Sequence, residues 1–304
     1  MRRVFATCKC AYCAPMTESG AILFSPSPAK GRVLVFDSGV GGLTVAEELR
    51  AIGPSLGVHY AADSGFFPYG DKSDAALAAR LPVVAKALCD VVKPDVFVIA
   101  CNTASTLALE DVRAVLDIPV IGTVPAIKPA AALSETKTIG LLATPGTIRR
   151  AYTAQLIKDF AQDARVIQHG SIELVKLAEA HAQGDDVDIG LFAAAQAPLF
   201  AADGGDEIDT IVLACTHFPL VRGQLMASAP RQISYIDSGA AIARQTIRML
   251  PETTRARGVG GSAFLTSDID ADPKLARVLR RYGFPDIQRV AIPPSTIMSE
   301  PSRP

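Results

Sequence analysis

The sequence predicts an α/β protein of two pseudo-symmetric domains, with mainly parallel sheets flanked by helices and the active site in the cleft between them. Short runs rich in Val, Ile or Leu alternate along the chain with Ala-rich stretches of helical spacing. This alternation is typical of parallel sheets that are covered by helices on both faces. In addition, a strand-like segment of the first half recurs in the second half, which indicates two related domains.

Eight short apolar runs are predicted to be strands, because Gly, Pro, Asp or Ser residues bound them. In chain order they are Arg32–Phe36, Val58–Ala61, Val96–Ala100, Val120–Ile121, Thr138–Leu142, Arg165–Gln168, Thr210–Ala214 and Ile233–Ile236. Stretches between and after these runs carry apolar residues at helical spacing. The expected helices are Thr44–Ile52, Asp74–Val92, Ser105–Val115, Ile148–Phe160, Glu173–His181, Ile189–Ala202 and Ala240–Met249.

An internal similarity divides the chain into two halves. The segment VFVIACNTAST (Val96–Thr106) resembles TIVLACTHFPL (Thr210–Leu220) at an offset of 114 positions. A weaker pair, VLVFDSGVGG and IGLLATPGTI, has the similar offset of 107 positions between Asp37 and Thr144. Chance similarity of short apolar strands is the alternative, but two agreeing offsets favour a repeat. We therefore expect a discontinuous first domain of residues 31–125 plus 232–304, and a second domain of residues 126–231.

The composition excludes several classes of partner. The formal net charge of −1 over 304 residues gives no indication of nucleic-acid binding. No apolar run approaches the roughly 20 residues of a membrane-spanning helix, and no secretory signal opens the chain, so a cytoplasmic location is expected. Residues 1–30 are expected to be a flexible extension. Cys8, Cys10 and Cys13 lie there, but structural zinc usually takes four ligands and no His is near, so no metal site is predicted.

Two cysteines follow predicted strands in matching contexts. Ligands of open α/β sheets bind at the carboxyl ends of the strands, where Cys101 and Cys215 are expected to lie. If the domains face each other, the two thiols approach one cleft from opposite sides. Inversion of a carbon stereocentre by proton transfer needs a base on one face and an acid on the other. A lone buried cysteine is usually a small hydrophobic residue, which is our interpretation of Cys89.

Polar residues beside the two cysteines could activate them. An ordinary thiol, with a pKa of about 8.5, is only a few per cent ionised at neutral pH. Asp37 is a candidate proton partner for Cys101, and His217 for Cys215, although Asp37 could instead cap a helix. Asn102, Thr103 and Thr216 suit binding of carboxylate and amino groups, whereas the glycines after Asp37 do not form a dinucleotide-binding motif.

Five short motifs stand out: Asp37-Ser38-Gly39-Val40-Gly41-Gly42, Pro68-Tyr69-Gly70, Ala100-Cys101-Asn102-Thr103-Ala104, Ala143-Thr144-Pro145-Gly146-Thr147 and Ala214-Cys215-Thr216-His217-Phe218-Pro219. In this order they resemble the glutamate racemase family, within the aspartate/glutamate racemase superfamily. The first two motifs favour glutamate over aspartate racemases. The chain departs from the family at Ser171, where many members have Cys. Glu173 lies in a region that contacts substrate in some members, but no substrate contact is expected of Glu173 itself.

The resemblance implies a cofactor-free isomerase that interconverts L- and D-glutamate and supplies D-glutamate for peptidoglycan. It implies that Cys101 takes the α-proton of D-glutamate and Cys215 that of L-glutamate, with Asp37 and His217 as their respective catalytic partners. The implied substrate-binding residues are Asp37, Ser38, Tyr69, Gly70, Asn102, Thr103, Thr144, Thr147, Thr216 and His217.

Several alternatives remain open at this point. Another activity of the superfamily, such as aspartate racemisation, is the closest one. A single-cysteine decarboxylase is disfavoured because both cysteines are present, and a redox pair because neither is part of a C-x-x-C. Binding of DNA gyrase, reported for some family members, would be at most a second role. A homodimer is compatible with all of these.

Overall fold

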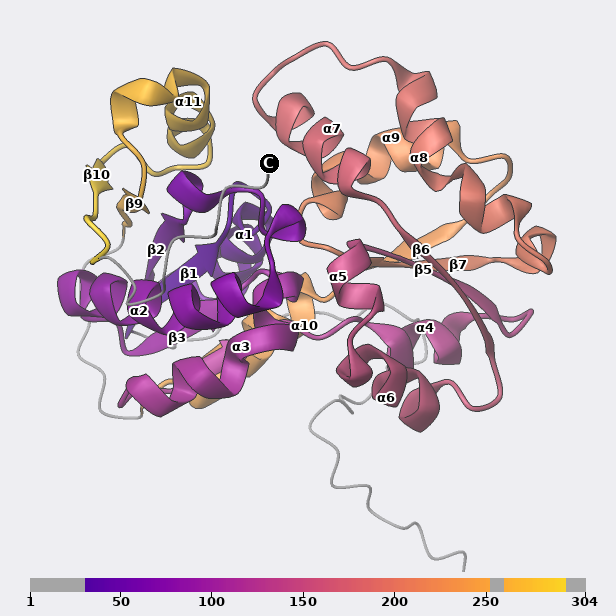
Figure 1. Cartoon of the computed structure of the whole chain (residues 1–304), viewed down its shortest axis with the longest axis horizontal. Coiled ribbons are helices and arrows are strands. Elements are labelled where there is room, and N and C mark those ends of the chain that lie inside the picture. The colour runs from indigo at the N-terminus through magenta and orange to yellow at the C-terminus, as the bar shows by residue number, and fades with distance from the viewer. Residues whose placement is uncertain (1–30, 252–259, 294–304) are drawn as a thin grey trace, which may run out of the picture.

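The computed structural model describes residues 31–251 and 260–293. Within these residues the chain forms two α/β domains that lie side by side, each around its own parallel sheet (Figure 1). The predicted fold class is therefore confirmed. The extension predicted over residues 1–30, with its three cysteines, lies outside the described residues.

The first sheet has six parallel strands in the order β10-β9-β2-β1-β3-β4. Alternate residues of a strand face opposite sides. Accordingly, Val33 and Val35 of β1 pack under α1, α10 and α11, whereas Leu34 and Phe36 pack under α2 and α3. The elements are β1 (Gly31–Asp37), β2 (Leu56–Ala62), β3 (Val96–Ile99), β4 (Val120–Gly122), β9 (Ala263–Leu265), β10 (Ile287–Arg289), α1 (Leu43–Ile52), α2 (Asp74–Val92), α3 (Asn102–Val115), α10 (Gly239–Met249) and α11 (Pro273–Arg281).

The second sheet has four parallel strands in the order β6-β5-β7-β8. One of its cores lies under α7, α8 and α9, and the other lies under α4 and α6. The elements are β5 (Thr138–Ala143), β6 (Arg165–Gly170), β7 (Thr210–Ala214), β8 (Ser234–Ile236), α4 (Ile127–Leu133), α5 (Pro145–Ile148), α6 (Ala151–Phe160), α7 (Ile172–Ala182), α8 (Ile189–Ala201) and α9 (Arg222–Ser228). Short 3₁₀ turns are η1 (Ser64–Phe66), η2 (Tyr69–Asp71), η3 (Gly205–Glu207), η4 (Phe218–Val221) and η5 (Ile269–Ala271).

The strand order confirms the predicted repeat. The order β2-β1-β3-β4 in the first sheet corresponds to β6-β5-β7-β8 in the second. The register corrects one of the two offsets, because Val33 pairs with Val96 whereas Ile139 pairs with Thr210. With β3 and β7 offset by 114 positions, β1 and β5 are offset by 106 rather than 107 positions. Ser38, not Asp37, is thus the counterpart of Thr144.

The predicted strands and helices all occur, but the sequence-based account missed several elements. Strands β9 and β10 and helices α4, α9 and α11 were not predicted. The two strands have three residues each, and β10 reads IQR, so neither carries a readable apolar pattern. The helix expected over Ile148–Phe160 begins later, as α6 at Ala151, and the short helix α5 before it was not predicted.

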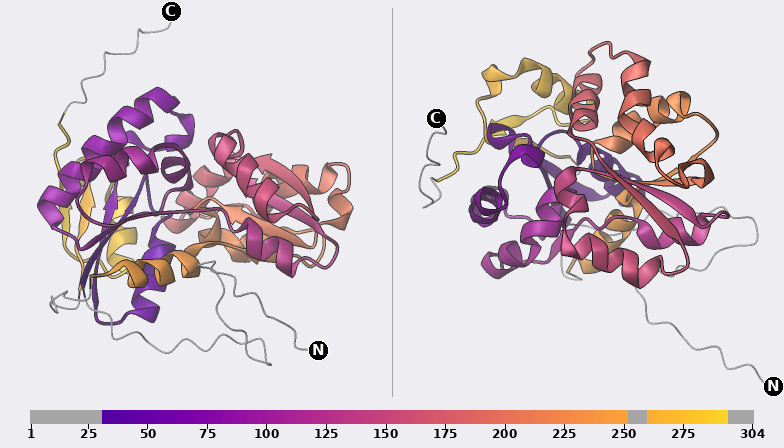
Figure 2. Two further views of the ribbon diagram at one scale, coloured as in Figure 1. Left: turned by 90° about the horizontal axis from the view of Figure 1, so that it is seen from below. Right: turned by 45° about the vertical axis from the view of Figure 1, so that its right-hand side comes forward.

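Strand β8 also shifts a domain boundary. The sequence-based division gave residues 232–304 to the first domain, whereas β8 pairs with β7 of the second sheet. We therefore propose that the chain returns to the first domain after β8, at the start of α10. Figure 2 shows that the chain passes between the two domains at this point and again between β4 and α4.

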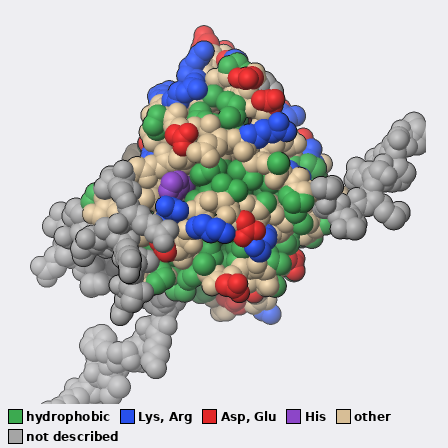
Figure 3. All heavy atoms as spheres, turned by 90° about the vertical axis from the view of Figure 1, so that its left-hand side faces the viewer, with side chains coloured by type: hydrophobic (Ala, Val, Ile, Leu, Met, Phe, Trp, Pro, Cys, Tyr) green, Lys and Arg blue, Asp and Glu red, His purple; other side chains and the backbone are tan. Residues whose placement is uncertain are grey.

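The surface is mixed in charge. Lys and Arg side chains alternate with Asp and Glu on the face shown in Figure 3, with hydrophobic side chains between them. Among the described helices, none is long and apolar enough to span a membrane.

Candidate active site

The two cysteines that follow β3 and β7 line one cavity between the domains. Cys101 precedes α3 and Cys215 precedes η4, and both side chains are buried. The cavity has a volume of about 360 Å³, part of which is open to solvent. Eight of the predicted substrate-binding residues line it with them: Ser38, Tyr69, Gly70, Asn102, Thr103, Thr144, Thr216 and His217. Pro68, Ile172 and Val175, which were not predicted, complete the wall.

The surroundings of Cys101 keep its thiol protonated. Burial, with the negative charge of Asp37 as the next contribution, raises the pKa of Cys101. Hydrogen bonds with the backbone of Ala104 and the hydroxyl of Ser38 act in the opposite direction. The net effect favours the proton-donating form of this thiol when no substrate is bound.

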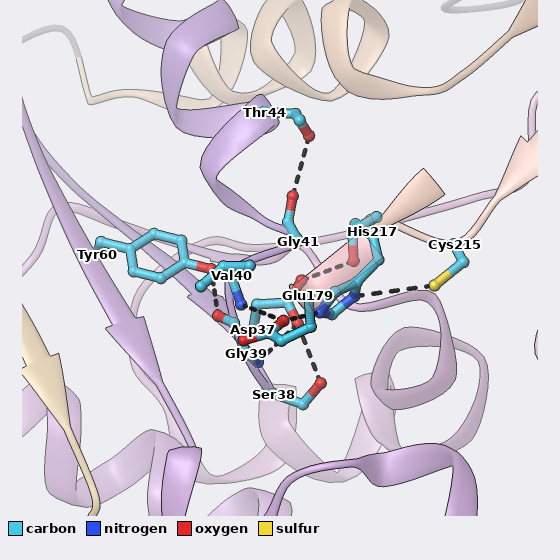
Figure 4. A network of polar contacts seen from close by, with 11 residues as sticks. Asp37, Ser38, Gly39, Val40, Gly41, Thr44, Tyr60, Glu179, Cys215 and His217 are labelled. Atoms are coloured by element: carbon cyan, nitrogen blue, oxygen red, sulfur yellow. Dashed lines mark hydrogen bonds and ion pairs between the residues drawn. The ribbon is translucent and has the colours of Figure 1, made fainter. Parts of the chain in front are cut away.

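Cys215 lies beside a buried histidine. The Nδ1 atom of His217 is 4.0 Å from the Cys215 sulfur, and its Nε2 atom is 2.7 Å from a carboxylate oxygen of Glu179 on α7. Burial lowers the pKa of His217, but its hydrogen bonds with Cys215 and Glu179 outweigh that effect and raise the pKa well above the usual value. Figure 4 shows the ring between the sulfur and the carboxylate. A protonated ring there favours negative charge on the sulfur.

Glu179 is a site residue that sequence reasoning missed. Of the two glutamates on α7, Glu173 is exposed, whereas Glu179 faces the cleft and also accepts a bond from the backbone of Val40 across the domain boundary. Ile172 and Val175 line the cavity from the same helix. Their spacing with Glu179, three and then four residues, places all three on one helix face. This spacing is the signal that could have identified Glu179.

Asp37 links the two domains. Its fully buried carboxylate accepts bonds from Thr216 Oγ1 at 2.7 Å, from Ser38 Oγ at 3.1 Å and from the Gly39 backbone at 3.2 Å. The contact with Thr216 spans the cleft to the residue after Cys215. The Asp37 carboxylate acts on Cys101 through its negative charge, which raises the pKa of the thiol.

Polar groups remain available inside the cavity. Thr103 Oγ1 lies 3.1 Å from Thr144 Oγ1, which in turn lies 3.0 Å from Thr147 Oγ1, so Thr147 supports the cavity wall through Thr144. Asn102 Oδ1 is buried and has no hydrogen-bond partner among the described residues. A buried acceptor of this kind costs free energy until a donor reaches it. The cavity thus has an acceptor suited to an ammonium group.

Comparison with known proteins gives consistent matches. Residues 44–246 match the family described as Asp/Glu/hydantoin racemase. Glutamate racemase of Escherichia coli strain K12 is 42% identical over 270 residues, which cover 88% of this chain and 94% of that protein. A crystal structure of Escherichia coli glutamate racemase with L-glutamate and the activator UDP-MurNAc-Ala superposes with a TM-score of 0.81 at 41% identity, covering 87% of this chain and 100% of that one. A crystal structure of glutamate racemase from Thermus thermophilus with β-chloro-D-alanine superposes with a TM-score of 0.67 at 29% identity. The match covers 86% of this chain and 97% of that one.

Proposed function

This chain belongs to the Asp/Glu/hydantoin racemase family, and we propose that it interconverts L- and D-glutamate with Cys101 and Cys215 as the two proton-transferring groups. The observation that carries the proposal is that two thiols from equivalent strand ends of a repeated domain line one cavity. The 42% identity to a glutamate racemase over most of both chains supports glutamate as the substrate. The D-glutamate formed would supply peptidoglycan synthesis.

The proposed reaction is a proton transfer in two steps. One cysteine acts as thiolate and takes the α-proton, which forms an S–H bond and leaves the electron pair of the C–H bond on the substrate. The other cysteine gives its proton to the opposite face of that carbon and becomes the thiolate. Cys101 takes the proton from D-glutamate and Cys215 from L-glutamate, so the enzyme can run in both directions.

The remaining polar groups would hold the substrate. Asn102 Oδ1, the unpaired acceptor, suits the ammonium group. The hydroxyls of Thr103 and Thr144 suit a carboxylate, because each can donate a hydrogen bond into the cavity, whereas the Thr216 hydroxyl already donates to Asp37 and can only accept there. Asp37 supports this set through Thr216 and favours the protonated form of Cys101.

The proposal is tested by circular dichroism of L-glutamate incubated with the purified protein without added cofactor. We expect the optical signal to decay to that of the racemate. L-aspartate in a parallel assay tests the aspartate racemase alternative, and a faster decay of its optical signal than that of L-glutamate would refute the substrate assignment.

A cytoplasmic location and a homodimer remain predictions.

The isotope pattern should reveal two separate bases. In heavy water, product of either handedness should carry deuterium at Cα from the first turnover, because the returning proton comes from a different thiol. Recovered substrate should gain deuterium much more slowly. Mass spectrometry of separated enantiomers measures both, and equal early labelling of substrate and product would indicate a single base.

The pH dependence of kcat/KM should be bell-shaped in both directions. Acid protonates the thiolate that must take the proton, and alkali removes the proton that the other thiol must give. With L-glutamate, where Cys101 is the thiol that gives the proton, burial and the charge of Asp37 raise the pKa of Cys101, so the alkaline limb should lie above the ordinary thiol value of about 8.5. The limbs belong to the coupled pair and not to one residue. An alkaline limb well below that value would contradict the environment described for Cys101.

Removing the charge on the His217 ring should slow the enzyme. We expect His217→Asn to lower kcat/KM by about tenfold, equivalent to about 1.4 kcal/mol of lost stabilisation of charge on Cys215. The loss with L-glutamate should be at least as large as that with D-glutamate. Glu179→Gln should give a smaller loss of the same kind, because the ring keeps a neutral partner. Full rates in both directions for His217→Asn would exclude a catalytic role.

A further inference from the structure

One wall of the cavity is made by the loop between β2 and α2. Pro68, Tyr69 and Gly70 of this loop line the cavity opposite Ile172 of α7. The approach is close, because a Cβ atom on Gly70 would lie 3.0 Å from the Ile172 side chain. Small shifts of the loop therefore change the space that is available to a ligand.

The hydroxyl of Tyr69 is occupied within the protein. Tyr69 is buried, and its hydroxyl donates a 2.7 Å hydrogen bond to Asp63 Oδ2. Burial, the charge of Asp63 and this hydrogen bond raise the pKa of Tyr69, so the hydroxyl remains a donor. The family resemblance gave Tyr69 as a substrate-binding residue, whereas its hydroxyl here serves to anchor the loop.

Asp63 is the centre of a buried polar cluster. Its side chain is fully buried and accepts bonds from both Nε and Nη2 of Arg80 at 2.6 Å, in addition to the Tyr69 hydroxyl. Thr266, directly after β9, donates to the second carboxylate oxygen at 2.7 Å. The Asp63 backbone N–H donates to Asp37 O at 2.9 Å. A buried carboxylate is tolerated only when its partners satisfy it, so the cluster fixes one geometry.

The same cluster ties the loop to the C-terminal strands. Thr266 Oγ1 accepts a bond from the Gly65 backbone at 3.0 Å, and the hydroxyls of Ser64 and Ser267 lie 2.7 Å apart. The Arg80 guanidinium also stacks on the ring of Phe66, 4.7 Å from its centroid. The Ser64–Phe66 end of the loop is thus held by groups that do not line the cavity.

We propose that Asp63, with Arg80 and Thr266, is a positioning residue for racemisation that holds Tyr69 so that the Pro68–Gly70 wall fits the substrate. The inference rests on the proposed function. It identifies a role for β9, because this strand leads directly into Thr266, which donates the remaining side-chain hydrogen bond to the Asp63 carboxylate. None of the three positioning residues lines the cavity.

A double-mutant cycle between Tyr69→Phe and Asp63→Asn tests the proposal. Each single variant should raise KM for both enantiomers by about tenfold and lower kcat less than about threefold, because a misplaced wall weakens binding of substrate and transition state alike. The double variant should be no worse than Asp63→Asn alone, since the hydroxyl acts only through the carboxylate. Asp203→Asn is the matched control, because Asp203 pairs with Arg165 on an exposed surface.

Three outcomes would overturn the proposal: unchanged KM for Tyr69→Phe, losses that add in the double variant, or a fall confined to kcat. Additive losses would mean that the hydroxyl contacts the substrate directly. If Asp63→Asn does not fold, Thr266→Val takes its place in the cycle and removes one of the four side-chain bonds to the carboxylate. Wild-type protein is assayed first. Absence of glutamate racemisation by the wild type would refute the proposed function, whereas normal wild-type activity with unaffected variants would refute only the positioning role of Asp63.

Discussion

Replacing either Cys101 or Cys215 by alanine should abolish racemisation, with kcat/KM falling by at least about a thousandfold in both directions. Every turnover needs one thiol to take a proton and the other to give one, so the loss of either stops both directions. Losses of this size are usual when a group that transfers the reacting proton is removed. Circular dichroism at a substrate wavelength measures the rate from each enantiomer.

The control for these variants is Cys89→Ala. Cys89 is a buried free thiol like the other two, but it lies on α2 among the hydrophobic residues of the first domain, away from the cavity. Its replacement should leave the rates unchanged, which separates loss of a reacting thiol from loss of a buried sulfur. A similar fall in activity for Cys89→Ala would show that core packing, and not proton transfer, explains the other two losses.

Mixing the two inactive variants tests whether one chain supplies the whole site. The structure places Cys101 and Cys215 of the same chain on one cavity. Mixed Cys101→Ala and Cys215→Ala protein should therefore stay inactive under conditions that let subunits exchange. A site shared between chains could combine an intact copy of each cysteine, and recovery of a sizeable fraction of activity would refute the intrachain site.

The main features of the fold and site could be predicted from the sequence because they depend on local patterns. Buried parallel strands are short continuous apolar runs, and the repeat of Ala-Cys after two of them located Cys101 and Cys215. The register was not readable in the same way, because a shift of one residue leaves an apolar run apolar. Only the strand pairing shows that Ser38 is the counterpart of Thr144.

Features that depend on contacts between distant segments could not be predicted. Glu179 contacts His217 because α7 packs beside η4; the spacing along α7 places Glu179 on the face of Ile172 and Val175 but does not reveal His217 as its partner. The role of the Tyr69 hydroxyl was also hidden, because its partner Asp63 is held by Arg80 on α2 and by Thr266 after β9. In each case the chemistry of the side chain was evident, but its partner was not.

Gly41→Ala should lower kcat/KM by at least about a hundredfold, since displacement of catalytic groups by about 1 Å can cost that much. Gly41 lies in the turn after β1, at the contact between the domains. A Cβ atom there would lie 2.6 Å from His217 Nδ1, 2.7 Å from Thr216 Oγ1 and 2.8 Å from the His217 backbone nitrogen. Because one of these atoms is backbone, rotation of a side chain cannot relieve the overlap.

The added methyl group should push η4 away from the first domain. That movement would break the bond from Thr216 to Asp37 and change the position of His217 beside Cys215. The control is Gly223→Ala on α9, where a Cβ atom meets nothing within 4 Å and alanine favours the helix. Its rates should equal those of the wild type, with thermal unfolding unchanged or slightly raised. Gly41→Ala protein that remains folded and as active as this control would mean that the domains react in a more open arrangement than the one described.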